Sequence, residues 1–132
     1  MIAYTLLGTN DLEKSAKFYD ALLAEVGGQR ASNLSPIFKD MDRMVIYAGA
    51  EGTPFFGISE PYDQQPANVG NGSFISLGAK DSADVDRLYA KAIELGATCE
   101  GKPGARKNQN MDFYAGYFRD PDGNKLNFFS MG

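Results

Sequence analysis

An internal repeat constrains the fold of this chain more than any other feature of its sequence. Two stretches offset by seventy residues align without a gap across most of a predicted helix. The matching residues are Leu7, Gly8, Asp11 and Tyr19, which recur as Leu77, Gly78, Asp81 and Tyr89. The hydrophobic periods of the two stretches also agree, so the sequence predicts a duplicated unit.

The first half begins with a strand followed by an amphipathic helix. Residues 2–8 form a short apolar run rich in strand-forming residues. The next apolar residues recur at helical spacing, and they are Leu12, Ala16, Tyr19, Leu22, Leu23 and Val26. Asn10 and Glu13 are spaced as in a capping box, and Gly27 stands where a helix end favours a left-handed residue. Both ends of this helix are therefore predicted.

The second half repeats this plan. Residues 73–79 predict a strand, Asp81 is the expected N-cap, and Gly96 is expected to end the helix. Three strand-like runs follow each helix, and they span residues 29–34, 43–50, 55–59, 98–101, 112–119 and 125–130. Each half is thus predicted as a β-α-β-β-β module, and the fold class as α+β.

The two modules are expected to belong to one domain of 132 residues. Residues 60–72 are rich in proline, glycine and polar residues, which is typical of a linker. Module 1 then covers residues 1–60 and module 2 residues 73–132. Because each helix covers one face of its half-sheet, we expect the other faces to pack together or to form a curved cleft.

The absence of histidine excludes more functions than any other compositional feature. Imidazole acid–base catalysis, imidazole metal ligation and Ser-His or Cys-His nucleophiles are impossible. Cys99 is the only cysteine, which excludes an internal disulfide, and the net charge of −4 argues against nucleic acid as a partner. With no signal peptide or membrane span in the sequence, we expect a cytoplasmic protein that does not bind a membrane.

The most specific motif is Asp-Pro-Asp-Gly-Asn at residues 120–124. Pro121 presets φ, Asp120 can accept a hydrogen bond from the backbone two residues on, and Gly123 can take a positive φ. The motif therefore predicts a tight hairpin between the last two strands.

In its context, this hairpin resembles the closing hairpin of the vicinal oxygen chelate superfamily, which includes glyoxalases, bleomycin-resistance proteins and extradiol dioxygenases. Residues 7–19 look like the opening strand and helix of that family, and Gly70-Asn71-Gly72 precedes the third matching block. The resemblance spans essentially the whole chain. It implies two βαβββ modules that form an incomplete barrel-like sheet around a central cleft, a divalent metal held by inner strands of both modules, and a homodimer.

The metal ligands that the resemblance implies are two histidines and two glutamates, or close variants. The two histidine positions fall on Tyr4 and Phe74, and one glutamate position falls on Asn127. The fourth position lies within residues 55–58, which contain no carboxylate, and the sequence does not assign it to one residue. Neutral groups without a carboxylate bind a divalent cation poorly, so we expect neither a metal nor another cofactor.

The candidate ligand-binding residues combine the inner strand faces with one basic loop. They are Tyr4, Leu6, Phe56, Phe74, Ser76, Arg106, Tyr114, Asn127 and Phe129. Period-two alternation puts Tyr4 with Leu6, and Phe74 with Ser76, on corresponding strand faces. Arg106, in the loop 101–107, either clamps a carboxylate or phosphate or is a solvated charge. The aromatic residues either line a pocket for a flat or apolar molecule or fill the core.

Three functions remain open from the sequence. The leading hypothesis is a metal-independent protein that binds, and by that sequesters, an aromatic or apolar small molecule. The alternative is a lyase, isomerase or dioxygenase-like enzyme that uses an atypical metal site with Glu60 or Asp112, or Tyr4 as an acid–base group. The third is a structural or interaction domain. The identity of the ligand is not encoded in any recognisable motif.

Overall fold

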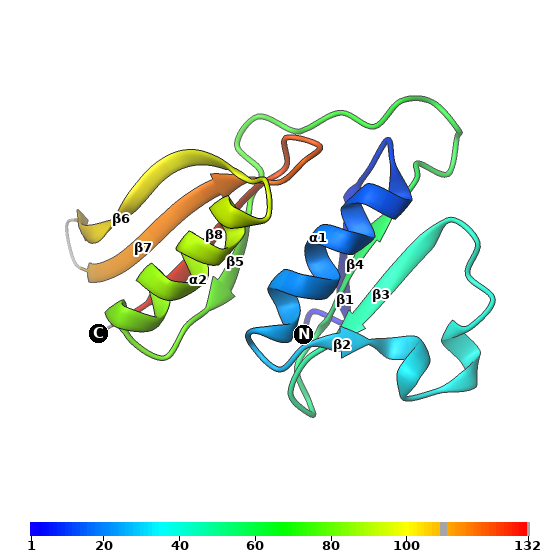
Figure 1. The fold of residues 1–132 in the computed structure, drawn as a ribbon, viewed down its shortest axis with the longest axis horizontal. Helices are drawn as coiled ribbons and strands as arrows, with labels where there is room; N and C mark the ends of the chain where they lie inside the picture. The colour runs from blue at the N-terminus through cyan, green and yellow to red at the C-terminus, as the bar shows by residue number, and fades with distance from the viewer. Residues whose placement is uncertain (109–110, 132) are drawn as a thin grey trace. The chain divides into compact units, whose positions relative to one another are not determined.

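The computed structural model describes residues 1–108 and 111–131 and contains two βαβββ modules (Figure 1). The first module consists of β1 (Tyr4–Gly8), α1 (Leu12–Ala24), β2 (Gln29–Arg30), β3 (Met44–Ala48) and β4 (Phe55–Ser59), with two short 3-10 helices, η1 (Ala31–Asn33) and η2 (Pro36–Phe38). The second module consists of β5 (Ile75–Gly78), α2 (Ser82–Glu94), β6 (Thr98–Asn108), β7 (Met111–Arg119) and β8 (Lys125–Ser130). Most contacts are made within two compact units of the chain, residues 1–68 and residues 69–132. The predicted α+β duplication is confirmed.

The two sheets have the same topology. Their strand orders are β1-β4-β3-β2 and β5-β8-β7-β6, and neither sheet closes into a barrel. In each module the first strand pairs in parallel with the last strand, and the remaining pairs are antiparallel. Neither helix among the described residues has the length and apolar composition needed to cross a membrane.

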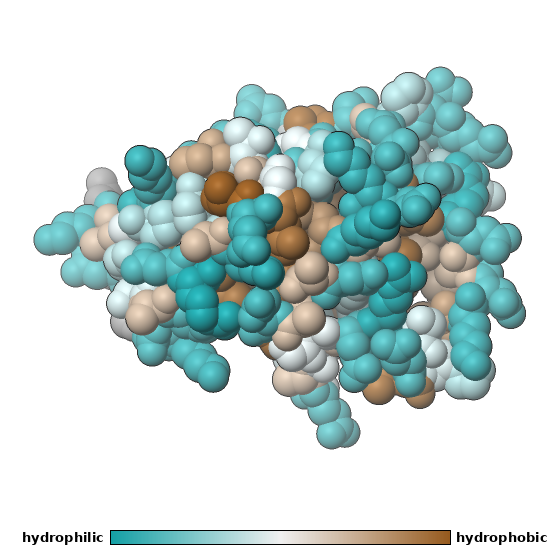
Figure 2. All heavy atoms as spheres, in the orientation of Figure 1, coloured by the Kyte–Doolittle hydropathy of each residue, from teal (hydrophilic) through white to brown (hydrophobic). Residues whose placement is uncertain are grey.

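Each sheet packs one face against the helix of its own module. In the first module the buried Tyr19 ring of α1 lies 5.0 Å from the Phe56 ring of β4, centroid to centroid. In the second module Leu88 of α2 is fully buried, and Phe118 and Phe128 stack at 5.6 Å. Polar side chains cover most of the face in view in Figure 2, with apolar residues exposed in smaller groups between them.

Four residues or motifs were predicted to begin or end the two helices, and the structure confirms three of these predictions. Asp81 caps α2 by accepting a hydrogen bond from the Asp84 N–H at 2.8 Å, and Gly27 and Gly96 take φ values of +78° and +109°. The predicted capping box at Asn10 is wrong, because Asp11 is the N-cap of α1 and accepts from the Lys14 N–H. Asn10 instead exchanges two hydrogen bonds with the backbone of Ala67, which fastens the linker to the start of the helix.

Two predicted strands have other lengths in the structure. β2 ends at Arg30, since Ala31 turns inward and packs against Ile46 and Ala48 of β3. β6 continues to Asn108, and its pairing with β7 shifts register between Cys99 and Gly104. The segment 101–107 was expected to be a loop and is a bulged strand, because its glycines tolerate the irregular pairing that a bulge requires.

The turn at residues 120–124 forms the predicted hairpin. The Asp120 side chain is buried at 3% exposure, and its Oδ1 accepts hydrogen bonds from the N–H groups of Asp122 and Asn124, both at 2.9 Å. Its Oδ2 accepts from Asn124 Nδ2 at 3.0 Å. Gly123 takes the expected positive φ of +88°. One carboxylate therefore satisfies three donors and fixes the turn.

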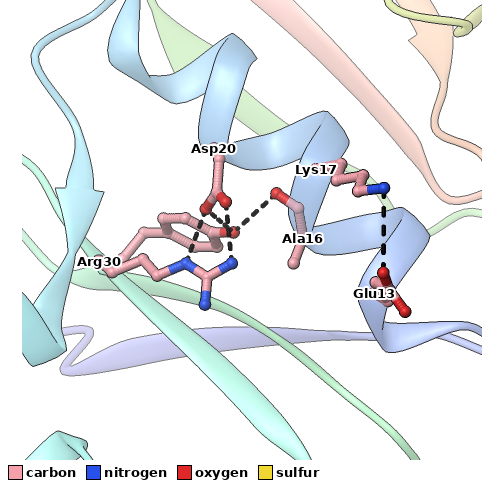
Figure 3. Close-up of polar contacts among 6 residues, drawn as sticks. Glu13, Ala16, Lys17, Asp20 and Arg30 are labelled. Carbon is pink, nitrogen blue, oxygen red and sulfur yellow. Dashed lines mark hydrogen bonds and ion pairs between the residues drawn. The ribbon is translucent and has the colours of Figure 1, made fainter.

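A polar cluster joins α1 to the strands β2 and β3 of the first sheet. Figure 3 shows the Arg30 side chain facing Asp20, and Arg30 Nε and Nη2 donate to the two carboxylate oxygens at 2.9 and 2.8 Å. The Tyr47 hydroxyl donates to Asp20 Oδ1 at 2.8 Å. Burial alone would raise the pKa of Asp20, but the hydrogen bonds from Arg30 and Tyr47 hold its pKa below the usual value.

Replacement of the buried turn carboxylate should destabilise the protein. We expect Asp120→Ala to lower the free energy of unfolding by about 2–3 kcal/mol, because buried backbone donors would lose their acceptor. Urea denaturation followed by circular dichroism measures the change. The control Asp40→Ala removes an exposed carboxylate and should change stability by less than about 0.5 kcal/mol. Equal effects of the two variants would contradict the proposed role of Asp120.

The Asp20 cluster should also make the free energy of unfolding depend on pH in the acid range. Since the folded-state pKa of Asp20 lies below its value of 3.8 in the unfolded chain, its ionised form stabilises the fold above that pH. This stabilisation is lost as the pH falls through the folded-state pKa. Asp20→Asn should therefore be less stable than the wild type at neutral pH, with the difference shrinking towards pH 2.

The Asp20 and Arg30 side chains are each 41% exposed, so solvent screening limits this difference to about 1 kcal/mol at neutral pH. Chemical denaturation at a series of pH values measures it. Asp40→Asn should follow the wild-type profile. A difference between Asp20→Asn and the wild type that does not change with pH would contradict the assignment.

Candidate functional site

The candidate site lies on the sheet faces that point away from the helices. We call the face of each sheet opposite its own helix the distal face of that module. Strand alternation and register assign the side chains to it. In the second module the distal residues that matter here are Phe74, Ser76, Arg106, Phe113, Tyr117, Lys125, Asn127 and Phe129. In the first module they are Tyr4, Leu6, Ile46, Phe55 and Gly57.

Aromatic rings from three segments occupy the distal face of the second module. The Phe74 ring lies 6.1 Å from the Tyr117 ring at an interplanar angle of 60°, and the Phe113 ring lies 5.4 Å from the Phe129 ring. Phe74 precedes the edge strand β5, and its side chain is 48% exposed. This face therefore offers an accessible ring beside a second one, which suits contact with a flat molecule.

Two cationic side chains lie over these rings. Lys125 Nζ lies 5.3 Å from the centroid of Tyr117 and 5.9 Å from that of Phe74. The Arg106 guanidinium carbon lies 5.9 Å from the centroid of Tyr117. At these distances the ring quadrupole attracts a cation. Both positive charges are thus drawn to Tyr117.

The backbone of β6 holds the Arg106 guanidinium in place. Its Nη2 donates to the carbonyl oxygen of Lys102 at 2.6 Å, and its Nη1 donates to that of Ala105 at 3.5 Å. Gly104 leaves the space for this arrangement, since a Cβ there would lie 2.9 Å from Arg106 Nη1. Arg106 was assigned to the candidate site from a basic segment, and the structure brings it to the Tyr117 ring.

One carboxylate lies near these cations but is engaged elsewhere. Glu100 Oε1 accepts a hydrogen bond from Arg119 Nη2 at 2.9 Å. This bond lowers the pKa of Glu100, and the charges of Arg119 and Lys125 lower it further. Within residues 1–108 and 111–131, neither Lys125 nor Arg106 forms an ion pair.

Asn127 lies at the centre of the same face, opposite Ser76 on one side and Tyr117 on the other. Its side chain is 2% exposed, and in the part of the chain that the structure describes its Oδ1 has no hydrogen-bond partner. An unpaired buried acceptor costs about 1–3 kcal/mol. A donor supplied by a bound molecule would remove that cost.

The distal face of the first module is filled more closely. A Cβ on Gly57 would lie 2.6 Å from Leu6 Cδ2 and 2.7 Å from Ile46 Cδ1, so these two side chains cover Gly57. The Phe38 ring of η2 packs on the Phe55 ring at 5.6 Å. Tyr4 and Leu6, on the edge strand β1, remain 60% and 42% exposed.

The strand register now assigns the fourth implied metal-ligand position to Gly57. Asn127 pairs with Ser76, and Gly57 pairs with Leu6. Ser76 and Leu6 correspond in the seventy-residue repeat, so Gly57 is the counterpart of Asn127.

The residues at the four implied positions do not fit a divalent metal. They offer a phenol, a phenyl ring, an amide and no side chain at all, whereas a divalent metal site in a protein usually contains several carboxylates or imidazoles. At the position without a side chain, apolar carbon atoms of Leu6 and Ile46 take up the space. Among the described residues, no three histidine, cysteine or acidic side chains gather as a metal site would require.

Two predicted site residues lie on the helix side of their sheets and not on the distal face. Phe56 packs against Tyr19 and Tyr47, because the register of β4 turns Phe55 and Gly57 to the distal face. The Tyr114 hydroxyl donates to the Asp86 carboxylate of α2 at 2.7 Å, and this bond raises the pKa of Tyr114. Phe56 and Tyr114 were expected on the same face as the other candidate residues, and the structure places both on the opposite face, against the helices.

The sequence prediction also missed three residues of this face, Phe113, Tyr117 and Lys125. Period-two alternation from Asn127 would have found Lys125, and pairing across the predicted hairpin would have found Tyr117 opposite Asn127. The remaining predicted residues of the second module, Phe74, Ser76, Arg106, Asn127 and Phe129, lie on one face of one sheet.

The first module contains two grooves away from its distal face. One has a volume of about 350 Å³ and is lined by polar residues that include Thr9, Asn10, Arg43 and Glu60. Its cation is engaged, since Arg43 donates to Glu60 at 3.3 Å and to the Pro61 carbonyl at 3.0 Å. The other, of about 600 Å³, runs beside α1, where Asp20 and Arg30 bind each other. In both grooves the arginine is thus engaged by a carboxylate of the same module.

Comparisons with known proteins agree on one family. The model of the Glyoxalase/Bleomycin resistance protein/Dioxygenase superfamily matches residues 1–128. A glyoxalase/bleomycin resistance protein from Albidiferax ferrireducens is 36% identical over 98% of this chain and 97% of its own, with a TM-score of 0.79. A hypothetical protein from S. aureus is 31% identical over 96% of this chain and 90% of its own, with a TM-score of 0.70.

A more distant structure shares the fold alone. A lactoylglutathione lyase from Agrobacterium tumefaciens is 20% identical over 98% of this chain and 92% of its own, with a TM-score of 0.66. None of the curated proteins matches the chain significantly.

The packing over Gly57 can be tested by a single added methyl group. Gly57→Ala should lower the free energy of unfolding by about 1 kcal/mol, because the new Cβ would push aside the terminal methyl groups of Leu6 and Ile46 and lie 3.2 Å from the Val45 carbonyl oxygen. Denaturant titration measures the change, and Leu6→Ala introduced with Gly57→Ala should cost less than the sum of the two single changes. Gly78→Ala is the matched control, since nothing lies within 4 Å of a Cβ there. Equal stability of the two glycine variants would refute this packing.

Proposed function

Because the chain belongs to the Glyoxalase/Bleomycin resistance protein/Dioxygenase superfamily, we propose that it is a metal-independent protein that binds a small aromatic molecule on the distal face of its second module. The observation that carries this proposal is the chemistry of the four implied ligand positions. Tyr4, Gly57, Phe74 and Asn127 bring neither a carboxylate nor an imidazole, and two of them bring aromatic rings.

The second distal face supports binding of a flat molecule for a physical reason. The exposed Phe74 ring and its neighbour Tyr117 bury apolar area against a planar partner without ordering long, flexible side chains. The Asn127 Oδ1 is buried without a partner in the described structure, so a ligand hydroxyl or N–H group that displaces the side chains over it gains an acceptor. Such a surface combines apolar contact with a few polar groups, as small-molecule sites do.

No specific observation favours the alternative of an enzyme. Glu60 is bound by Arg43, and Asp112 is an exposed residue of β7, so neither carboxylate is held in a position typical of a buried catalytic group. The homodimer and the cytoplasmic location stay predictions from the family resemblance and the sequence.

Binding without metal can be measured directly by calorimetry. EDTA-treated protein should bind at least one of a panel of naphthalene derivatives, and added Zn²⁺ or Mn²⁺ should leave the Kd unchanged. Phe74→Ala should weaken that binding about tenfold, since loss of one ring contact costs on the order of 1.4 kcal/mol. Tyr62→Ala, which removes a fully exposed ring in the linker, should not affect it.

Two results would overturn this proposal. The first is binding that appears only after a divalent metal is added. The second is about one equivalent of divalent metal in protein purified without chelator, measured by elemental analysis.

A further inference from the structure

We infer that the molecule bound at this face is a planar aromatic anion, recognised by Lys125 and Arg106. The inference rests on the proposed function, because it specifies the charge of the ligand at the same site. It starts from the contacts of these two cations, which lie on β8 and β6, on either side of β7, at 5.3 and 5.9 Å from the centroid of the Tyr117 ring.

The positive charges on this face are not balanced by carboxylates. Its charged side chains nearest the rings are Lys125, Arg106 and Arg119, against the single carboxylate of Glu100. Glu100 is bound by Arg119, and neither Lys125 nor Arg106 forms an ion pair within the described structure. The whole chain nevertheless carries a net charge of −4. Local positive charge in an acidic protein favours an anionic ligand here.

The donors of Arg106 are prepared for such a ligand. Nη2 and Nη1 each donate once to the backbone, which fixes the guanidinium plane beside Tyr117. Of its five N–H groups, three then remain without a protein acceptor in the described structure. A carboxylate placed beside the guanidinium would accept from these donors, and the charge of Lys125, 5.3 Å from the centroid of the same ring, would add to the attraction. Because the guanidinium is already held, little entropy is lost when the ligand binds.

The rings determine the shape of the anion. Phe74 presents an accessible ring next to Lys125, whose ammonium lies over both Phe74 and Tyr117. A ligand ring in contact with Phe74 therefore brings its carboxylate close to the Lys125 ammonium. A neutral analogue keeps only the ring contact, and a cationic analogue is repelled by both side chains.

Three probes with the same ring separate these cases. Naphthalene carboxylate, naphthamide and naphthylmethylammonium differ mainly in charge, and their affinities can be measured by calorimetry at neutral pH. We expect the carboxylate to bind at least about tenfold more tightly than the amide, and the ammonium to bind more weakly than either. The preference for the carboxylate should shrink at high salt.

Two variants assign the charge preference to these residues. Lys125→Met keeps the aliphatic chain. It should raise the Kd for naphthalene carboxylate about tenfold and change the Kd for naphthamide by no more than about twofold. Gly104→Ala changes no charge but displaces the Arg106 guanidinium. It should raise the Kd for naphthalene carboxylate by a factor of about three to ten. Lys107→Met removes an exposed lysine of β6 that contacts neither ring, and serves as the control for net charge. Thermal unfolding of each variant verifies that it is folded.

The possible failures are distinguishable. If the amide binds as tightly as the carboxylate, the anion inference is wrong and the proposed function stands. If the carboxylate preference survives in both Lys125→Met and Gly104→Ala, the assignment to these cations is wrong. If neither these probes nor the wider naphthalene panel binds, the proposed function itself fails.

Discussion

In each module the parallel pairing of the first strand with the last determines which side chains share a surface. The strands β1 and β4, and likewise β5 and β8, come from opposite ends of their modules, and the helix between them covers one face of the sheet. Period-two alternation then assigns every side chain to the helix side or to the distal face. The pairs Leu6 with Gly57 and Ser76 with Asn127 follow from this register.

The duplicated topology carries two different distal faces. In the first module, Leu6 and Ile46 close over Gly57, so the surface there is apolar and leaves no room for a side chain at that position. In the second module, the corresponding Asn127 keeps an unpaired acceptor beside aromatic rings and unpaired cations. The same strand order thus supports packing in one half and, in our proposal, ligand recognition in the other.

Features encoded by local sequence were predictable, whereas those that depend on long-range pairing were not. The Asp81 cap and the hairpin at residues 120–124 depend on residues close in the chain, and the repeat is visible directly as matching residues seventy positions apart. Asn10 was mistaken for a cap because its real partner, Ala67, is far away in sequence. Phe56 was placed on the wrong face because alternation alone does not define the register of β4, whereas Lys125 was overlooked although alternation from Asn127 would have found it.

The most direct test of the account is to map ligand contacts on the metal-free protein. ¹⁵N-labelled, EDTA-treated protein can be titrated with naphthalene carboxylate while amide chemical shifts are recorded. The account predicts saturable shifts that cluster at Phe74, Arg106, Tyr117 and residues 125–127. Shifts confined to the polar groove around Arg43, or shifts that appear only when a divalent metal is present, would contradict it.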